Sequence, residues 1–438
     1  MATILPTPRL WLVLALGIPL ALGGAVIPGL ERFVFFFDVG LLTVWYLTGR
    51  QARTWEVARV TRVTDPVLSV RVKNVVTLEI ENLSGSSMTV AIRDEPPENC
   101  HAEGNEFRIF LPRRERLKKK YALTPTSRGE WEFRGLFIRY PALLGLAQVQ
   151  KMILPPTPVR VYPNVKAIEE FELLKQTGHL NHLGMRQSRQ KGLGMEFESL
   201  RDYNEDDFRK IDWKASARRG KLVVRNFEQE TNQGVVVCVD VGRHMLGEVE
   251  GVRKLDHCLD AALLFLHSAE RAGDQVGLLT FNDRVESYIA PRRGKTQVAR
   301  ILESLYDAQA EPVQPNYIEA FSFLASRWKK RSLVVVFTDA ENVDQAGMLT
   351  VALSQIRRRH LVYVVRVSDP KLREFLAADI DGERELFDQS AALWYIGDRK
   401  RAEAALRGAG LNSLEAEPQN LAKELVTAYL RVKRLSLI

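Results

Sequence analysis

The chain has 438 residues, of which 46% are hydrophobic and 26% charged, and its net charge is +8. This length leaves room for two or three domains with cores of their own. The basic residues are spread along the chain rather than gathered in a stripe, which argues against a dedicated nucleic-acid-binding protein. A small basic surplus also suits a protein that lies against anionic lipid headgroups.

Three cysteines occur, Cys100, Cys238 and Cys258, and none of them forms a C-x-x-C pair. Cys238 lies inside the apolar run "GVVVCVDV". This usage predicts reduced, mostly buried thiols. It also argues against a Cys/His zinc site, because no two ligands have the required spacing.

Two apolar segments near the start predict a membrane anchor at residues 1–54. The segment from Leu10 to Leu30 has 21 residues and no charge, and as a helix it would be about 30 Å long, enough to cross a bilayer core. The segment from Phe33 to Gly49 is interrupted by Asp38. We therefore expect spans at about 10–30 and 33–49. Asp38 is either an interfacial carboxylate that reaches water or a polar contact to another membrane helix.

Orientation follows from the basic residues after the second span, which are Arg50, Arg53, Arg59 and Arg62. The loop between the spans has one Arg and one Glu. The positive-inside rule then places both chain ends and the soluble domains in the cytoplasm, with the hairpin in a bacterial inner membrane.

Residues 55–165 read as a small β-sandwich. Short alternating segments such as "LSVRVKNVVTLEIENL" and "MTVAIRDEPP" are separated by Asn, Ser-Gly and Pro-Pro, a spacing typical of sandwich strands. The run "RRERLKKK", Arg113 to Lys120, is either a solvated hairpin edge or a contact with lipid headgroups.

A linking segment, residues 166–233, contains "EDDFRKIDWKASARRGKLVVRNFEQE", in which acidic and basic side chains are closely interleaved. Asp212-Trp213-Lys214 fits a bare nuclease-like D-x-K pattern, which Asp202, Asp206 and Asp207 could extend, but so short a motif is weak. Nucleic-acid binding through the basic residues is opposed by the interleaved acids.

We favour a third interpretation, an ion-pair clamp that locks the sandwich onto the following domain, with Trp213 as an apolar anchor. A surface recognised by a protein partner is compatible with it. The expected network comprises Glu196, Arg201, Asp206, Asp207, Arg209, Asp212, Trp213, Arg218 and Arg225.

From residue 234 to 438, apolar strands alternate with amphipathic helices. The strands include "GVVVCVDV", "QVGLLTFND", "SLVVVFTDAEN" and "LVYVVRVSD". This alternation predicts a Rossmann-type α/β domain with a mostly parallel sheet covered on both faces. The functional crevice of such a sheet lies beyond the carboxyl ends of its strands, where Asp240 and Asp339 are expected.

The stretch from "GLGMEFESLRDYNEDDFRKIDWKASARRGKLVVRNFEQE" into "VVVCVDVGRHM" resembles the bacterial domain-of-unknown-function 58 family, and the resemblance extends over essentially the whole chain. Asn204-Glu205 departs from it, since the family usually has a Gly before the paired Asp. The resemblance implies a von Willebrand factor A-like domain and frequent pairing with a MoxR-type AAA+ ATPase. It supplies no reaction.

Von Willebrand A domains hold a divalent metal with D-x-S-x-S, a Thr and a later Asp. This chain has Asp240-Val241-Gly242-Arg243-His244 instead, and Pro315-Asn316 falls near the Thr position. Mg²⁺ prefers oxygen ligands in a near-octahedral array. We therefore expect a degenerate site, Asp240, His244 and Asp339, that binds a divalent cation weakly at most.

These observations predict a membrane-anchored, non-enzymatic adaptor that binds no nucleic acid. The resemblance implies that it works beside a MoxR-type AAA+ ATPase. The fragment "KGLG" lacks the spacing of a phosphate-binding loop, so no ATPase activity is expected. The alternative is a metal-dependent ligand-binding module that uses the degenerate site. The oligomeric state stays open.

Overall fold

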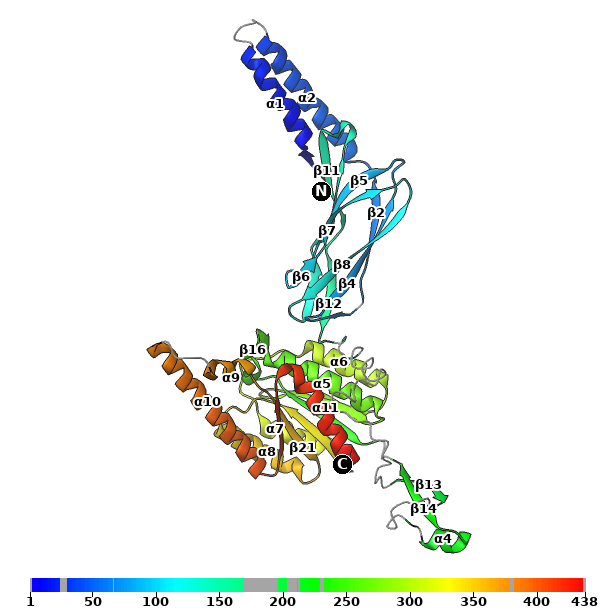
Figure 1. Cartoon of the computed structure of the whole chain (residues 1–438), viewed down its shortest axis with the longest axis vertical. Coiled ribbons are helices and arrows are strands. Elements are labelled where there is room, and N and C mark those ends of the chain that lie inside the picture. Colours follow the sequence, from blue (N-terminus) through cyan, green and yellow to red (C-terminus); the bar gives the residue numbers. More distant parts are fainter. Residues whose placement is uncertain are drawn as a thin grey trace. The chain divides into compact units, whose positions relative to one another are not determined.

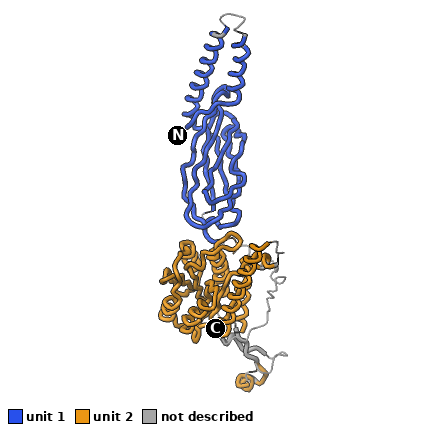
Figure 2. The backbone as a smooth tube through the Cα atoms, turned by 90° about the vertical axis from the view of Figure 1, so that its left-hand side faces the viewer, with its two compact units in different colours: residues 1–164 blue, residues 165–438 orange. Residues whose placement is uncertain are grey.

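A computed structural model of the chain describes residues 2–23, 30–65, 67–164, 166, 168, 196–202, 211, 213–228, 232–377 and 382–435. The chain divides into two compact units, Met1–Asn164 and Val165–Ile438, which Figure 2 colours separately. Helices and sheets occur in both units, so the expected mixed α/β class is confirmed.

The first unit starts with a short strand and a helical hairpin (Figure 1): β1 is Thr3–Pro6, α1 is Pro8–Gly23 and α2 is Leu30–Ala52. Within α2, the stretch Arg32–Ala52 is long and apolar enough to cross a membrane, whereas the apolar part of α1, Pro8–Pro19, is shorter. The predicted first span, at about 10–30, includes α1, and its residues 24–29 lie outside the described residues. The described residues therefore contain one helix of membrane-crossing length and a shorter apolar one.

The outward faces of this hairpin are strongly apolar. Large hydrophobic side chains of both helices are exposed, among them Trp11, Leu12, Leu16, Ile18, Leu22, Phe33, Phe35, Phe36, Leu42, Tyr46 and Leu47. Between the helices, a Cβ on Gly17 would lie 3.4 Å from Asp38 Oδ1. Gly17 of α1 therefore faces the carboxylate of α2.

Both ends of the hairpin are attached to the same β-sheet. Residues 3–6, expected within the anchor, instead pair antiparallel with β11 as an edge strand. At the other end the Tyr140 hydroxyl donates to the Ala52 carbonyl over 2.9 Å. Ala52 is fully buried in the core of this unit. The base of the hairpin is therefore fixed to the sandwich on two sides.

The remaining strands of the first unit form a sandwich. A five-stranded sheet has the order β1-β11-β10-β5-β7, a four-stranded sheet the order β2-β4-β8-β6, and a small sheet the order β3-β12-β9. The strands are β2 Ala58–Val63, β3 Leu68–Ser69, β4 Asn74–Asn82, β5 Met88–Glu95, β6 Cys100–Glu103, β7 Glu106–Leu111, β8 Arg116–Pro125, β9 Gly129–Phe133, β10 Gly135–Pro141, β11 Ala147–Leu154 and β12 Thr157–Tyr162.

Alternating burial along these strands explains the sandwich. Val76, Leu78 and Ile80 of β4 are buried in the same cluster as Val90 and Ile92 of β5. One face of each strand fills the core and the other meets solvent, as the period-2 pattern of an antiparallel sheet requires.

The second unit is built on a six-stranded sheet of order β19-β18-β15-β20-β21-β22, in which only the edge strand β19 runs antiparallel. Its strands are β15 Gly234–Asp240, β18 Gln275–Phe281, β19 Val285–Arg292, β20 Ser332–Phe337, β21 Leu361–Val367 and β22 Asn412–Ala416. Its helices are α5 Lys254–Arg271, α6 Lys295–Asp307, α7 Tyr317–Arg327, α8 Val343–Arg357, α9 Pro370–Ala377, α10 Glu383–Gly408 and α11 Pro418–Arg434. Short strands β16 Glu248–Val249 and β17 Val252–Arg253 precede α5.

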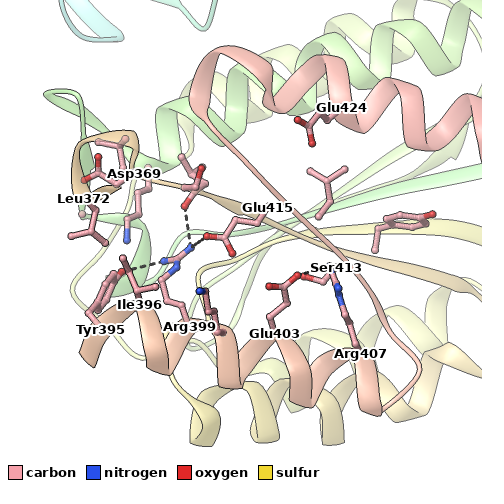
Figure 3. Close-up of a pocket in the computed structure, with 18 of the residues that line it drawn as sticks. Asp369, Leu372, Tyr395, Ile396, Arg399, Glu403, Arg407, Ser413, Glu415 and Glu424 are labelled. Carbon is pink, nitrogen blue, oxygen red and sulfur yellow. Dashed lines mark hydrogen bonds and ion pairs between the residues drawn. The ribbon is translucent and has the colours of Figure 1, made fainter. Parts of the chain in front are cut away.

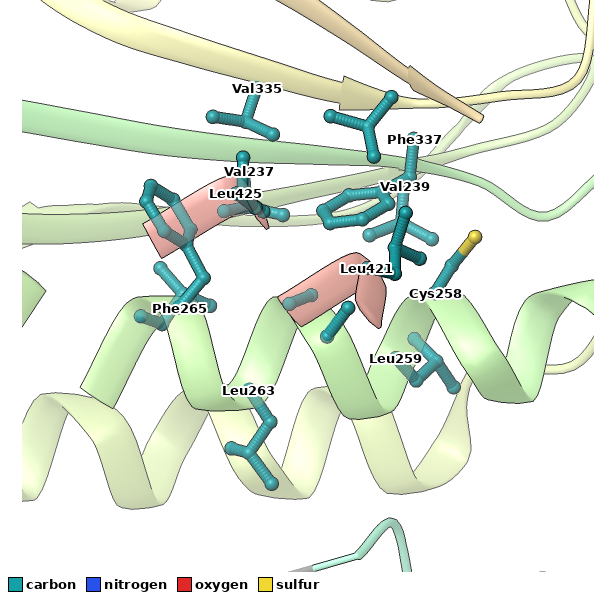
Figure 4. Packing of buried hydrophobic residues seen from close by; sticks show 14 of the residues in the cluster. Val237, Val239, Cys258, Leu259, Leu263, Phe265, Val335, Phe337, Leu421 and Leu425 are labelled. Atoms are coloured by element: carbon teal, nitrogen blue, oxygen red, sulfur yellow. The ribbon is translucent and has the colours of Figure 1, made fainter. Parts of the chain in front are cut away.

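Helices cover both faces of this sheet. Figure 4 shows Val237 and Val335 of the sheet packed with Phe265 of α5 and Leu425 of α11. On the other face, Val236 and Val334 belong to a cluster with side chains of α7, α8 and α10. The continuous apolar strands of the sequence are explained by this two-sided burial.

The family motif lies in a small element of its own within the second unit. Strands β13 Glu196–Asp202 and β14 Val223–Glu228 pair antiparallel, and the helix α4 Trp213–Arg219 contacts β14. Ser216 Oγ accepts a hydrogen bond from the Val223 amide over 2.9 Å, which ties the helix to the strand.

Candidate functional site

Two carboxylates meet at the carboxyl edge of the sheet in the second unit. Asp240 is the last residue of β15, and Asp339 lies two residues beyond the end of β20. These strands are hydrogen-bonded neighbours, with Val239 opposite Phe337. The topology thus brings together two residues that are 99 positions apart in the sequence.

Asp240 is completely buried and is satisfied by hydroxyl and amide donors. Oδ2 accepts from the Thr338 hydroxyl at 2.6 Å and from the Tyr317 hydroxyl at 3.4 Å. Oδ1 accepts from the Gly242 amide at 2.8 Å. Burial raises the pKa of Asp240 to about 6, although these hydrogen bonds pull it in the opposite direction.

Asp339 is instead held by two cations. Lys254 Nζ lies 2.5 Å from Oδ2, and Arg399 Nη1 lies 2.9 Å from Oδ1 and 3.1 Å from Oδ2. The Asp339 side chain is only 3% exposed, against 11% for Lys254 and 9% for Arg399. A carboxylate this deeply buried needs such partners, because an unpaired charge would be very costly to desolvate.

Further side chains extend this ion cluster toward the surface. Lys254 Nζ also contacts Glu341 Oε1 at 3.0 Å, and the Tyr395 hydroxyl donates to the same oxygen at 3.1 Å. Arg399 Nη2 donates to Glu415 Oε1 and to the Val367 carbonyl, both at 3.1 Å. Figure 3 shows Arg399 between Tyr395 and Glu415.

The charges of this cluster reinforce one another. Burial alone would raise the pKa of Asp339, but Arg399 and Lys254 together hold it below its usual value. Burial alone would likewise lower the pKa of Lys254, and the carboxylates of Asp339 and Glu341 raise it above its usual value. All three core members are therefore ionised at neutral pH.

A divalent metal does not fit these residues. The Lys254 ammonium and the Arg399 guanidinium already occupy both oxygens of Asp339. His244 is 9% exposed and burial lowers its pKa. In the described part of the chain, no group of three or more His, Cys, Asp or Glu side chains is placed to hold a metal. Asp240, His244 and Asp339 thus do not converge as the ligand set that the sequence suggested.

A pocket of about 1190 Å³ adjoins the ion cluster and contains Lys254 and Arg399 in its lining. It runs along β22 and is bordered by α10, α11 and α9 (Figure 3). Its charged lining residues are five basic and five acidic, namely Lys254, Arg399, Lys400, Arg407, Arg431, Glu248, Asp369, Glu403, Glu415 and Glu424. The described lining contains neither His nor Cys.

An apolar stripe follows the first half of α10 and reaches this pocket. Leu386, Phe387, Leu393 and Trp394 are 52%, 75%, 61% and 67% exposed, and Leu393 also lines the pocket. Positions seven apart share one face of a helix, so these four side chains form a single stripe. Large exposed aromatic and aliphatic side chains in one patch are typical of protein-docking surfaces.

The predicted clamp residues are only partly described. Glu196 and Arg201 lie on β13, Arg225 on β14, and Trp213 and Arg218 on α4. The remaining four, Asp206, Asp207, Arg209 and Asp212, lie outside the described residues. Among the described residues Trp213 is 65% exposed, and its role as an apolar anchor stays a prediction. Ile211 and Val223, at 7% and 0% exposed, are buried apolar residues in the described part of this stretch.

Comparison with known proteins identifies the family. The family described as "Protein of unknown function DUF58" matches residues 199–398, which include β14, the strand-end carboxylates and most of α10. Residues 199–398 of the chain therefore belong to this family. No curated protein sequence matches the chain.

Several solved structures are similar to parts of this chain. BatB from Bacteroides thetaiotaomicron, a conserved hypothetical protein, is 14% identical over 46% of this chain and 98% of its own, with a TM-score of 0.32. The FixG-related protein from Vibrio parahaemolyticus is 10% identical over 24% of this chain and 98% of its own, with a TM-score of 0.19. Proximal thread matrix protein 1 from the mussel byssus is 11% identical over 46% of this chain and 47% of its own, with a TM-score of 0.27.

Sequence reasoning missed Lys254 and Arg399, the partners of Asp339. A signal for Arg399 exists, because it falls on the buried face of α10 together with Ala392, Ala402 and Leu406. A charge in phase with buried apolar positions indicates a buried ion pair. Lys254 gives no comparable signal. It is the first residue of α5, and a lysine at the start of a helix is usually solvated.

Proposed function

We propose that this protein is a membrane-anchored, non-enzymatic adaptor whose α/β unit binds a protein partner without a metal ion. The partner we propose is a MoxR-type AAA+ ATPase, on the strength of the family resemblance. The single observation that carries the proposal is the exposed stripe Leu386, Phe387, Leu393 and Trp394, of which Leu393 also lines the pocket. Aromatic anchors beside a concave surface are what interface hot spots require.

The pocket supports a protein partner rather than a small ionic ligand. Its acidic and basic lining residues are equal in number, so it offers no net charge to attract a phosphate or a free cation. Apolar residues such as Leu372, Ile396 and Leu414 lie between them. A peptide segment with mixed polar and apolar side chains matches such a lining.

The ion cluster supports a metal-independent mode of binding within a von Willebrand A-like fold. In ion-dependent members of that fold a divalent cation stands at the strand ends, where Lys254 and Arg399 neutralise Asp339 here. We expect calorimetric titration with Mg²⁺, Mn²⁺ and Zn²⁺ to give no heat. Heat that disappears in Asp339→Ala would favour the alternative, a metal-dependent ligand-binding module.

We further propose that both helices of the hairpin enter the membrane and that the soluble units face the cytoplasm. Support comes from the exposed apolar faces of α1 and α2 and from the fixation of both hairpin ends to one sheet. Arginines near the base, such as Arg50 and Arg53, favour the cytoplasmic side. Alkaline phosphatase fused to the C-terminus should therefore be inactive in cells, and an active fusion would contradict this orientation.

Co-purification tests the adaptor function. The full chain in detergent micelles should retain the MoxR-type ATPase of the same bacterium, with and without EDTA. Phe387→Ala with Trp394→Ala should weaken this binding at least tenfold, because two aromatic anchors are lost.

Met348→Ala is the matched control, since Met348 is 59% exposed on α8 and lies outside the stripe. If the double variant and the parent bind the ATPase equally, the stripe is not part of the interface. Failure of the parent chain to retain the ATPase would refute the partner itself.

A further inference from the structure

One tip of the sandwich exposes two leucines in a strained turn. The short helical turn η1, Leu143–Gly145, joins β10 to β11, and its Leu143 and Leu144 are 58% and 66% exposed. Leu144 has φ +67°, in the left-handed region that a branched side chain rarely adopts. A turn that only needed to be soluble would favour Gly, Asn or Asp at such a position.

This leucine turn lies at the base of the helical hairpin. The Thr7 amide donates to the Leu146 carbonyl at 3.1 Å, and the Thr7 hydroxyl donates to the Gly145 carbonyl at 2.8 Å. Thr7 directly precedes α1. A Cβ on Gly145 would lie 3.1 Å from Arg9 Nη1, so the Arg9 side chain covers the turn.

The base of the hairpin has the composition of a membrane–water boundary. Trp11 and Tyr46 are 61% and 50% exposed, and the basic residues Arg9 and Arg50 lie close to them in the sequence. Tryptophan and tyrosine prefer the headgroup level of a bilayer, and arginines flank it. Leu143 and Leu144 lie next to this part of the hairpin, since η1 contacts α2.

A basic turn lies at the same end of the sandwich. The Asn82 amide donates to the Glu115 carbonyl at 3.0 Å, and the Leu83 amide donates to the Val57 carbonyl at 3.0 Å. These bonds hold the turn between β7 and β8 close to residue 57, five positions after the end of α2. Arg113 and Arg114, at the tip of this turn, are both exposed.

We propose that this end of the sandwich is a second membrane contact, in which Leu143 and Leu144 insert among the lipids and Arg113 and Arg114 bind anionic phospholipid headgroups. The two turns would then fix the sandwich against the bilayer surface. Buried apolar area and attraction to anionic lipid are the two forces that hold an interfacial segment. This inference rests on the proposed membrane hairpin.

Depth measurement on the full chain tests the leucine contact. Single cysteines at Leu144, Glu130 and Phe36 are labelled with a polarity-sensitive fluorophore, and the protein is placed in nanodiscs of phosphatidylcholine and phosphatidylglycerol. The native thiols interfere little, because Cys238 and Cys258 are buried and burial raises the pKa of the half-buried Cys100 to about 12. Glu130 is exposed on β9 at the opposite end of the sandwich.

We expect the emission of the Leu144→Cys label to shift to shorter wavelength, as for Phe36→Cys, while the Glu130→Cys label stays in water. If the label at 144 behaves like the one at 130 while the one at 36 lies in lipid, the second contact is refuted and the anchor survives. If the label at 36 also reports water, both proposals are wrong.

Charge reversal tests the basic turn. In the Leu144→Cys background, Arg113→Glu with Arg114→Glu should abolish the part of the shift that depends on phosphatidylglycerol and leave the shift in pure phosphatidylcholine unchanged. The matched control is Lys73→Glu with Arg160→Glu, which changes the charge equally at the far end of the sandwich. An equal effect of both double variants would contradict the assignment to Arg113 and Arg114.

Discussion

Two charge-rich regions of this molecule differ sharply. The motif segment, residues 205–230, concentrates acidic and basic side chains in one stretch of sequence, yet its Trp213 is 65% exposed and its described elements are a two-stranded sheet and a short helix. The ion cluster around Asp339 draws its members from distant positions, including Lys254, Arg399 and Glu415, and is almost completely buried at its centre. In the described part of the chain, the buried ion cluster around Asp339 is thus built from residues that lie far apart in the sequence. Topology assembles such a network by bringing strand ends and helix faces together.

The largest expected effect tests the buried side of this comparison. Asp339→Ala leaves Lys254 and Arg399 without their shared carboxylate and should destabilise the protein by about 3–5 kcal/mol, the usual cost of an unpaired buried charge. Denaturant unfolding of the full chain in detergent, followed by circular dichroism, measures this loss.

The control for this variant is Glu130→Ala, whose partner Arg160 is 54% exposed at the side chain. It should cost under about 1 kcal/mol, as surface pairs do. A loss equally small for Asp339→Ala would mean that the cluster is solvated and that the contrast between the two regions is false.

The next largest effect is the pH dependence of stability that Asp240 should cause. The pKa of Asp240 is raised to about 6 in the folded protein, from an ordinary value of 3.8. Between these values the folded state binds more protons than the unfolded state, so the free energy of unfolding falls as pH rises. The whole shift corresponds to about 3 kcal/mol lost between pH 4 and pH 7.

Asp240→Asn should lack this slope, because an amide does not ionise. Unfolding free energies of the variant and the parent at a series of pH values give the difference directly. Asp339 contributes in the opposite sense, since its pKa is lowered, and its stabilisation is lost only as pH falls below about 4. An unchanged slope in Asp240→Asn would show that Asp240 is ionised throughout this range.

A smaller effect is expected within the motif segment. Ser216→Ala removes the acceptor of the buried Val223 amide and should cost about 1 kcal/mol. Hydrogen exchange at Val223 should become faster, while amides of β15 keep their protection. Unchanged exchange at Val223 would indicate that the amide has another acceptor.

The smallest expected effect on stability concerns Trp213 in the motif segment. Trp213→Ala should change stability by less than about 0.5 kcal/mol, because its side chain is mostly in solvent. A loss of more than about 2 kcal/mol in the free energy of unfolding would show that the indole is a packed anchor and that the motif segment is a packed network.

Local patterns of sequence determined much of this protein. The continuous apolar strand at Gly234–Asp240 is buried on every residue, and the alternation in Asn74–Asn82 is matched by alternating burial. Such periodicities reflect which faces of a strand meet the core, and they are visible in a few consecutive residues. The apolar length of α2 could be predicted from the sequence for the same reason, because it too is a property of consecutive residues.

Contacts between distant residues were decided only by the tertiary structure. Thr3–Pro6 is a strand because it pairs with the edge of β11. Asp339 is paired with Lys254 and Arg399 because α5 begins, and α10 passes, at the carboxyl edge of the sheet. A single sequence carries no record of which strand lies beside which. The burial of Arg399 leaves a local signal, but its pairing with Asp339, 60 positions away, does not, and Lys254, 85 positions away, leaves neither. Sequence periodicity thus fixed what is buried, and chain topology fixed which charges meet there.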